Sequence, residues 1–292
     1  MSTEKRNENF MLKQSRYSKG KKNVKQYSKN NASKKSGSGK NSYNAYYKKN
    51  DDGFQPKSNG KSNYGKKKYS SKSKGYPKKN AQKPSIKIAF LGGLNEIGKN
   101  ITLVECENDI IIIDCGMAFP DGDMLGVDLV IPDFTYIEQN ADRVKGIILT
   151  HGHEDHIGGL PFLLSKVNVP IYGTPLTLGL VGNKLKEHSL YNQSQLNVIN
   201  AGQSIKLGCM KIDFIHVNHS IPDAVTFAIH TPGGTIVHTG DFKIDCTPIT
   251  GDMIDLSSFA RVGDEGVLAL LSESTNAERP GYTPTERTVS DS

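Results

Sequence analysis

The chain has 292 residues and a formal net charge of +7 at pH 7, which averages two regions of opposite charge. Residues 1–85 hold 24 Lys and Arg against 4 Asp and Glu, whereas the remainder holds 13 of the 37 basic and 26 of the 30 acidic residues. No run approaches the roughly 18 apolar residues that a membrane-spanning helix needs, and Met1 leads into polar residues rather than an apolar signal segment. With four cysteines and no CxxC pair, we expect a cytoplasmic protein with reduced thiols rather than a membrane or disulfide-stabilised one.

Residues 1–85 form a basic extension in which Lys, Ser, Asn and Gly dominate and Val, Ile and Leu are nearly absent. Such a segment cannot bury enough apolar surface to offset its ordering entropy, so it is predicted to be disordered. Eight of the 12 tyrosines lie here among lysine clusters, such as Lys66, Lys67 and Lys68 before Tyr69. Because lysine neutralises phosphates and tyrosine stacks on unpaired bases, the extension favours contact with RNA or the ribosome. The alternative is a solubilising tail without a specific partner.

Residues 86–292 are predicted to form a folded domain that begins with short strands. Ile86–Phe90, Ile101–Cys106 and Asp109–Asp114 read as three strands separated by turns that contain Gly or Asn, and the apolar run Lys145–Thr150 ends at a histidine cluster. Helical spacing of apolar residues follows at Gly158–Val167 and Pro175–His188, and four further strands are expected at Lys211–Val217, Ala224–Ile229, Thr235–Thr239 and Val267–Leu271. Helices that lie between more numerous strands indicate an α/β fold with packed sheets.

The histidine cluster directly after the fourth predicted strand carries the clearest chemistry. His151, His153, Asp155 and His156 lie within six positions, and imidazoles with a carboxylate suit Zn²⁺ or a similar divalent ion. Four such residues are too many for one tetrahedral site that keeps a water position, so they predict two adjacent ions. The small residues Gly152, Gly158 and Gly159 are expected to let the backbone turn tightly around them.

Two residues further along the chain fit the same site. His219 and Asp241 each follow a predicted strand, and a carboxylate such as Asp241 can bridge two ions. Asp114, at the end of the run IIIIDCG, is expected to accept a hydrogen bond from a ligand histidine and so orient it. A single histidine at a strand end is usually structural, which is the interpretation for the four histidines His188, His216, His230 and His238, although His238 is close enough to Asp241 to support the ligands.

The order HxHxDH, then a single His, then a single Asp is the motif set of the metallo-β-lactamase superfamily. The surrounding segments resemble one family in it, the bacterial ribonuclease J enzymes of the β-CASP group. They are GGLNEIGKN (Gly92–Asn100), FPDGDMLGVDLVIPD (Phe119–Asp133), THGHEDHIGG (Thr150–Gly159), VNHSIPDA (Val217–Ala224), HTGDFKID (His238–Asp245) and ESTNAERPGYTP (Glu273–Pro284). The resemblance runs from about Lys87 to the C-terminus and leaves out the basic extension.

The resemblance implies an αββα sandwich and a ribonuclease with two zinc ions, for which manganese is a second fit. The first ion would be held by His151, His153 and His219, and the second by Asp155 and His156, with Asp241 between them. Asp155 and Asp241 would thus serve catalysis, in which a hydroxide held between the ions attacks an RNA phosphodiester. The family degrades RNA from a 5′-monophosphate end, cuts internally and forms homo-oligomers. It also binds a structural calcium ion through backbone carbonyls that match Leu125 and Val127.

The chain departs from the family pattern at its end and at two positions. The family usually has Asp at Glu273 and Gly at Asn95, neither of which is a ligand. Family members continue for several hundred residues beyond the point that matches Ser292, so we expect an incomplete sandwich, a weakened second ion site and a partly exposed inner apolar face. Two other functions stay open. One is a metallohydrolase of small esters or thioesters, and the other is a non-catalytic chain that binds RNA through its extension.

Overall fold

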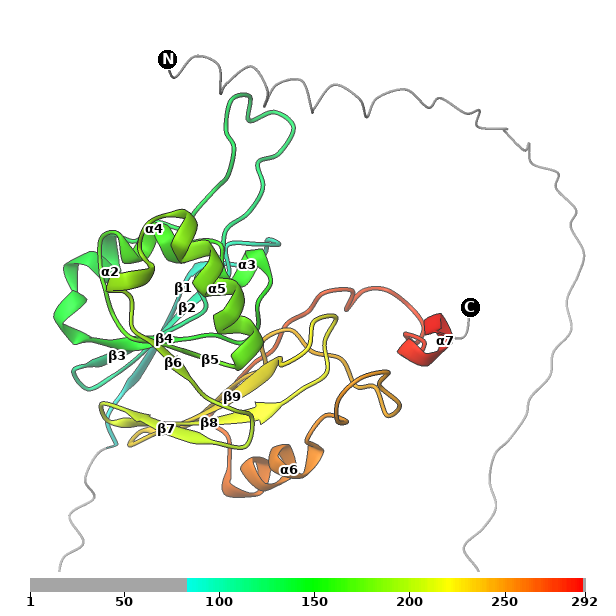
Figure 1. The fold of residues 1–292 in the computed structure, drawn as a ribbon. Helices are drawn as coiled ribbons and strands as arrows, with labels where there is room; N and C mark the ends of the chain where they lie inside the picture. The colour runs from blue at the N-terminus through cyan, green and yellow to red at the C-terminus, as the bar shows by residue number, and fades with distance from the viewer. Residues whose placement is uncertain (1–82, 291–292) are drawn as a thin grey trace, which may run out of the picture. The chain divides into compact units, whose positions relative to one another are not determined.

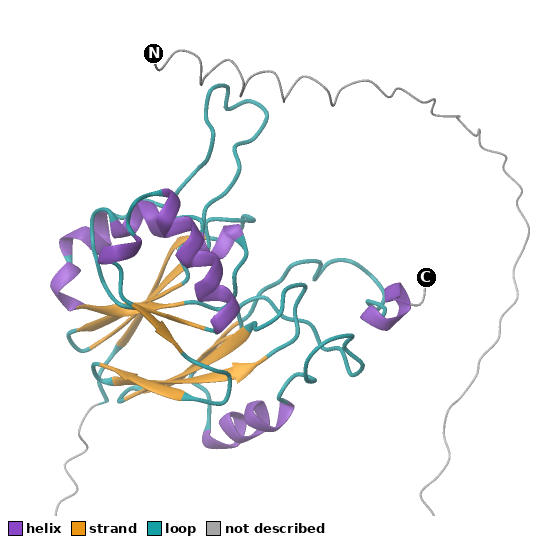
Figure 2. Cartoon of the chain, viewed as in Figure 1, coloured by secondary structure: helices purple, strands orange, loops and turns teal. Residues whose placement is uncertain are grey.

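The computed structural model describes residues 83–290. The predicted extension lies outside the described residues except for its last three positions, and so do Lys66, Lys67, Lys68 and Tyr69. The described part forms two stacked sheets with helices on the outer side of each, as Figures 1 and 2 show. No helix within residues 83–290 has the length and apolar character needed to cross a membrane.

The first sheet combines an antiparallel half with a parallel half. Its first three strands pair as an antiparallel meander, and its last three run parallel to the third. In sheet order the strands are β1 (Ile86–Gly92), β2 (Ile101–Cys106), β3 (Asp109–Ile113), β4 (Val144–Ile148), β5 (Ile171–Gly173) and β6 (Leu196–Val198). The connections carry α2 (Thr135–Gln139), η2 (Ala141–Arg143), α3 (Glu154–Ile157), α4 (Leu160–Leu164), α5 (Pro175–Glu187) and η3 (Tyr191–Gln193).

The second sheet is an antiparallel meander with one parallel strand added at its edge. Its strands are β7 (Ser204–Leu207), β8 (Met210–His216), β9 (Val225–Thr231), β10 (Gly234–His238) and β11 (Ala269–Leu271), and α6 (Leu256–Glu265) connects the last two. After β11 the chain runs to a short helix, α7 (Glu286–Ser290). The Asp245 carboxylate accepts the backbone N–H groups of Thr247 and Glu286, which fastens this last segment to the loop after β10.

The central strands are continuously apolar because both of their faces are buried. In β3, Ile110 and Ile112 pack towards the helices, whereas Ile111 and Ile113 pack into the core between the sheets. Side chains alternate between the two faces of a strand, so one isoleucine run can serve two cores at once. Phe214 and Phe227 of the second sheet fill the core between the sheets from the other side, with ring centroids 5.0 Å apart. This packing holds the two sheets together and fixes where their strands end.

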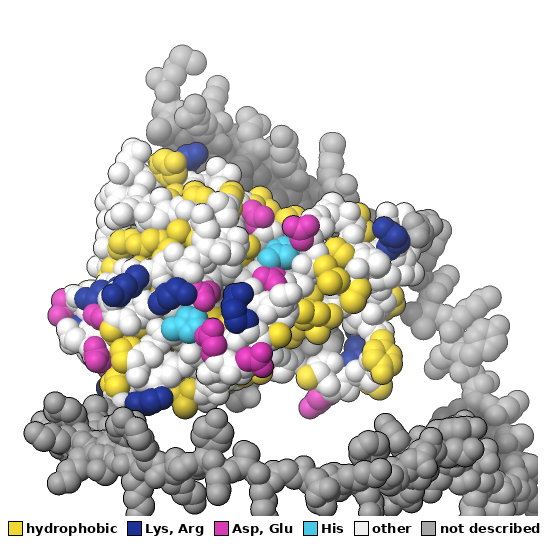
Figure 3. Space-filling view, turned by 90° about the horizontal axis from the view of Figure 1, so that it is seen from below, with side chains coloured by type: hydrophobic (Ala, Val, Ile, Leu, Met, Phe, Trp, Pro, Cys, Tyr) yellow, Lys and Arg dark blue, Asp and Glu magenta, His cyan; other side chains and the backbone are white. Residues whose placement is uncertain are grey.

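The outer face of the second sheet is largely polar. Side chains of Lys, Arg, Asp, Glu and His gather on this face, which Figure 3 shows from below. There Asp213 accepts hydrogen bonds from Ser204 and pairs with Lys211 and His230 at 2.7 and 3.0 Å. A small apolar cluster around Val237 and Val262 seats α6 against the same sheet.

The sheets part along one side, where β1 and β11 are the edge strands. Phe90 of β1 lies on the same side of its strand as Ile86 and Ile88, which pack into the core between the sheets, yet it is 42% exposed. It borders a cleft of about 730 Å³ that runs from Phe90 and Leu270 to the strand ends that carry the predicted ligands. Phe90 is therefore partly exposed at this side, whereas the buried core between the sheets is covered.

The predicted strands all occur, with ends that differ by up to two residues. The helix predicted over Gly158–Val167 is wrong in its extent. Only α4 (Leu160–Leu164) lies within this range, and α3 (Glu154–Ile157) precedes it, with Gly158 and Gly159 between the two helices. The apolar spacing did not reveal α3 because three of its four residues are polar.

We expect Glu105 to stabilise the fold at neutral pH and to lose this contribution in acid. Its carboxylate accepts hydrogen bonds from Lys87, Arg143 and Tyr136 at 2.7–2.9 Å, and although burial opposes the effect, these donors lower its pKa from 4.5 to about 2. The contribution is therefore complete above pH 4.5 and is lost as the pH falls towards 2. Glu105→Gln should cost about 1.5–3 kcal/mol in urea denaturation at pH 7 and less at pH 3. Glu138→Gln, which breaks an exposed pair with Lys166, is the control and should change little.

Candidate metal centre

The predicted ligand cluster lies where β4 ends and α3 begins. The chain after β3 runs beside α3 and fixes it through backbone hydrogen bonds, from Cys115 N to His156 O at 2.8 Å and from Met117 N to Glu154 O at 3.2 Å. His153 stands at the N-cap of α3, and Asp155 and His156 follow in its single turn. The sharp change of direction at the strand end thereby brings His151, His153 and His156 to the same side.

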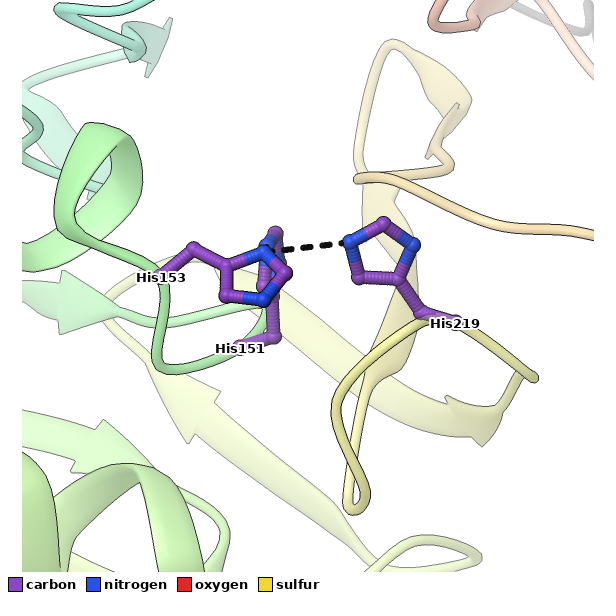
Figure 4. Close-up of side chains that lie close together, drawn as sticks. All are labelled: His151, His153 and His219. Atoms are coloured by element: carbon purple, nitrogen blue, oxygen red, sulfur yellow. Dashed lines mark hydrogen bonds between the residues drawn. The ribbon is translucent and has the colours of Figure 1, made fainter. Parts of the chain in front are cut away.

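His151, His153 and His219 form the first group of ligand-type side chains (Figure 4). His219 comes from the loop after β8, so this group joins loops of both sheets. The ring nitrogens of His151 and His153 lie 3.0 Å apart, and those of His153 and His219 lie 3.2 Å apart. Three imidazole nitrogens that converge in this way fit a single divalent ion.

The second group consists of His156 and Asp241, with His151 shared between the groups. Asp241 follows β10, and its two carboxylate oxygens face different histidines. Oδ1 lies 3.4 Å from Nε2 of His156, and Oδ2 lies 3.6 Å from Nε2 of His219. The Asp155 carboxylate lies beside this group, 3.5 Å from Nε2 of His156. All six predicted metal ligands therefore meet at one place.

Asp114 fixes the far side of this cluster. It is buried, its φ of 59° lies in the left-handed region, and its Oδ2 lies 2.8 Å from Nδ1 of His156. Thr150 donates its backbone N–H and its hydroxyl to the two oxygens of the same carboxylate, both at 2.8 Å. A residue other than glycine adopts such a backbone conformation only where its surroundings enforce it. The contacts turn Nε2 of His156 towards Asp241, Asp155 and Asn100.

Burial and charge set the protonation of the cluster. Burial holds the pKa of His151 and of His219 below the usual range, so both imidazoles are neutral, as a metal ligand must be. Burial would also lower the pKa of His156, but the Asp114 and Asp241 carboxylates raise it to about 10. Asp241 keeps its charge, since the hydrogen bond from His156 lowers its pKa to about 2 despite burial. The proton on His156 therefore balances the charge of Asp241, and a metal ion that binds this imidazole would displace the proton.

The glycines of the cluster serve close packing rather than tight turning. Gly158 and Gly159 have φ values of −66° and −81°, which any residue adopts. A Cβ on Gly159 would stand 2.6 Å from the carbonyl oxygen of Gly116, and one on Gly152 would stand 2.5 Å from Leu180. The tightest contact involves a glycine that the sequence did not single out, because a Cβ on Gly116 would stand 1.6 Å from the carbonyl oxygen of Asp155.

The remaining predicted residues lie around the cluster or apart from it. His238 accepts the backbone N–H of Gly240 at 3.2 Å, next to Asp241, and borders the cleft. Leu125 and Val127 lie in the long loop between β3 and α2, which projects from the domain (Figure 1), and neither belongs to the ligand groups. His188, His216 and His230 also lie outside both groups, in agreement with their structural interpretation.

Two contributors were missed by the sequence reasoning. Asn100, which ends the motif Gly92–Asn100, directs its amide nitrogen to Asp155 and His156. Glu273, noted only as a departure from a family pattern, accepts the backbone N–H of Phe242 beside Asp241 at 3.4 Å. The one signal that could have indicated them is their place in the motifs Gly92–Asn100 and Glu273–Pro284, to which the sequence analysis had given no chemical role.

This geometry agrees with the comparison to known families. Residues 94–271, more than half of the chain, match the family model described as the metallo-beta-lactamase superfamily. The chain belongs to this superfamily. Metallo-β-lactamase members bind divalent metal ions, and the two ligand groups fit that property. The predicted fold class is confirmed by the two sheets, their helical layers and this match.

Several relatives carry the ribonuclease J name that the motifs predicted. Ribonuclease J 1 of Streptococcus pyogenes is 50% identical over 207 residues, which cover 71% of this metallo-β-lactamase chain and 37% of the relative. Ribonuclease J2 of Bacillus subtilis is 48% identical over 213 residues, which cover 73% of this chain and 38% of the relative. Ribonuclease J of Helicobacter pylori is 48% identical over 208 residues, which cover 71% of this chain and 30% of the relative. The chain thus spans 30–38% of the length of these relatives.

A solved structure shares the fold at low sequence identity. The crystal structure of a protein of unknown function from Enterococcus faecalis superimposes with a TM-score of 0.52 at 18% identity, covering 69% of this chain and 52% of that one. This similarity supports the fold alone.

Proposed function

We propose that this chain is the metal-binding part of a ribonuclease that hydrolyses phosphodiester bonds of RNA with two divalent ions. The observation that carries the proposal is the position of Asp241, whose two oxygens face histidines of different ligand groups. A carboxylate in this position can hold two ions roughly 3.5–4 Å apart. The similarity to proteins named ribonuclease J supplies RNA as the substrate.

The charge of the cleft supports a metal-dependent reaction. Among the described residues that line it there is no Lys or Arg, whereas five are acidic: Glu96, Asp114, Asp155, Asp241 and Glu273. An RNA phosphate would be repelled from this cleft unless cations were bound there. Two divalent ions would remove that repulsion, so the cleft requires them for binding as well as for chemistry.

We propose a role for each residue of the cluster. His151, His153 and His219 would hold the first ion, Asp155 and His156 the second, and Asp241 both. Bound ions would supply an activated water and neutralise charge on the phosphoryl oxygens. Asp114 keeps the His156 ring oriented. Zinc is the ion we propose, and manganese fits the same donors. On RNA we propose 5′-to-3′ degradation from a 5′-monophosphate end, together with internal cleavage.

Cleavage of a 5′-monophosphate RNA in the presence of Zn²⁺ or Mn²⁺ tests the function. We expect Asp155→Ala to abolish turnover, because the second ion loses a ligand and the charge that attracts it. His188→Ala removes a histidine outside both ligand groups that packs against Phe162, and it should keep wild-type turnover. A 5′-triphosphate RNA and a small thioester serve as substrate controls.

The outcomes separate the alternatives. Turnover that is lost in Asp155→Ala, kept in His188→Ala and faster on the monophosphate supports the proposal. Hydrolysis of the thioester without cleavage of RNA would contradict it and favour a small-molecule hydrolase. A chain that binds both ions but cleaves neither substrate would show that these residues alone do not suffice for catalysis.

A further inference from the structure

The motif Gly92–Asn100 wraps around its last residue and brings it to the second ligand group. The Asn100 side-chain nitrogen Nδ2 lies 3.1 Å from the carbonyl oxygen of Asp155, 3.3 Å from the Asp155 carboxylate oxygen Oδ2 and 3.1 Å from Nε2 of His156. Two of these three neighbours are oxygens that can only accept, so the amide nitrogen, and not the amide oxygen, faces Asp155. One side chain therefore contacts both of the predicted ligands that α3 provides.

The backbone holds Asn100 in this place independently of its side chain. Its N–H donates to the carbonyl oxygen of Asp155 at 3.0 Å, and its own carbonyl accepts the N–H of Gly116 at 2.9 Å. Gly93 makes room for the amide, since a Cβ there would stand 2.4 Å from Oδ1 of Asn100, and its φ of +81° suits glycine. Gly93 thus allows the loop to lie close against the Asn100 side chain.

Asp155 needs such a partner more than the other ligands do. Its side chain is 34% exposed, whereas that of His156 is 3% exposed and is held by Asp114. Within residues 83–290, Asn100 and the His156 ring are the two groups that contact the Asp155 carboxylate. Without the amide, this carboxylate could rotate into the solvent of the cleft.

We propose that Asn100 is a positioning residue for the second metal ion, because its amide holds the Asp155 carboxylate towards His156. The inference rests on the proposed two-ion centre and adds to it a residue that contacts ligands without being one. Asn100 has no contact with His153 or His219 among its hydrogen bonds. Its loss should therefore weaken the second ion and leave the first unchanged.

Titration with Zn²⁺ against a chromogenic chelator, and with Mn²⁺ followed by electron paramagnetic resonance, measures the two ions separately. Loss of a partner that orients a metal ligand typically lowers affinity 10–100-fold, so we expect Asn100→Ala to weaken the second ion by about this factor. The Mn²⁺ signal should change from a coupled pair to a single ion at intermediate concentration. Asn168→Ala is the matched control. It removes a hydrogen bond of 2.8 Å that the side-chain amide of Asn168 donates to the carbonyl oxygen of Gln193.

Folding is checked by thermal denaturation of the metal-free proteins. Asn100→Ala keeps both backbone hydrogen bonds and should melt near the wild-type temperature. Asn100→Ser, whose hydroxyl is too short to reach Asp155, provides a second variant if alanine does not fold. Two ions with wild-type affinities in the folded variant would overturn the inference, and so would a wild-type chain that binds a single ion. A wild-type chain that binds none would instead contradict the proposed metal centre itself.

Discussion

Asp241→Asn is expected to abolish RNA cleavage and to remove one of the two ions. Asparagine keeps the shape of the side chain but offers one oxygen in place of two, so it can face His156 or His219 as an acceptor but not both. It also removes a negative charge from a partly buried site at the cleft. Loss of a residue that only hydrogen-bonds to a metal ligand lowers metal affinity by about 10–100-fold. We therefore expect loss of this bridging ligand to lower metal affinity by at least about 100-fold.

Elemental analysis after dialysis, together with RNA cleavage, measures this effect. Asp142→Asn changes an exposed aspartate of η2 and should bind metal and cleave RNA as the wild type does. An Asp241→Asn variant that retained two ions at wild-type affinity would show that Asp241 does not bridge them.

Gly116→Ala is expected to displace α3, which carries Asp155 and His156, and to destabilise the whole domain. Its Cβ would stand 1.6 Å from the carbonyl oxygen and 2.3 Å from the carbonyl carbon of Asp155, which are backbone atoms that cannot turn aside. Relief requires α3 to move away from the segment after β3. Overpacking of this kind costs about 1–3 kcal/mol and sometimes more, and for a domain of this size each kcal/mol lowers Tm by about 2–4 °C.

Thermal denaturation compares this variant with Gly179→Ala. Gly179 lies in α5, where an added Cβ meets nothing within 4 Å. Alanine has the higher helix propensity, so this control should raise stability by up to about 1 kcal/mol. Equal melting temperatures for Gly116→Ala and the wild type would mean that the segment after β3 and α3 can separate without cost.

The sequence was sufficient for the longer strands because the core is built from long apolar runs. The runs at Ile110 and Ile147 have both faces buried, so their apolar character is continuous and easy to detect. Elements with weak or short patterns were missed, including β5, β6 and β7, which have three or four residues each. The helix α6 was also missed, since Val262 is its one fully buried residue and the rest of its surface is polar or partly exposed.

The ligand cluster could be predicted because its residues are close in sequence or follow strands. The residues that support it could not, since their contacts join distant positions. Asn100 and Asp155 are 55 residues apart, and Asp114 and His156 are 42 apart. Asp114 was nevertheless predicted from its place at the end of a strand, whereas nothing in the local pattern distinguished Asn100 from other loop asparagines. The close approach of Gly116 to α3 likewise depends on tertiary packing alone.

The ligands come from loops of both sheets, with His151, His153, Asp155 and His156 on one and His219 and Asp241 on the other. Ions bound there would therefore act as cross-links between the two halves of the sandwich, at the end where one side of the sheets lies open. Binding to the folded state alone adds about 2.7 kcal/mol for each ion present at 100 times its Kd. A protein built in this way would be most exposed to unfolding and proteolysis when divalent ions are scarce, so the metal supply of the cell would govern how long the protein survives as well as how fast it works.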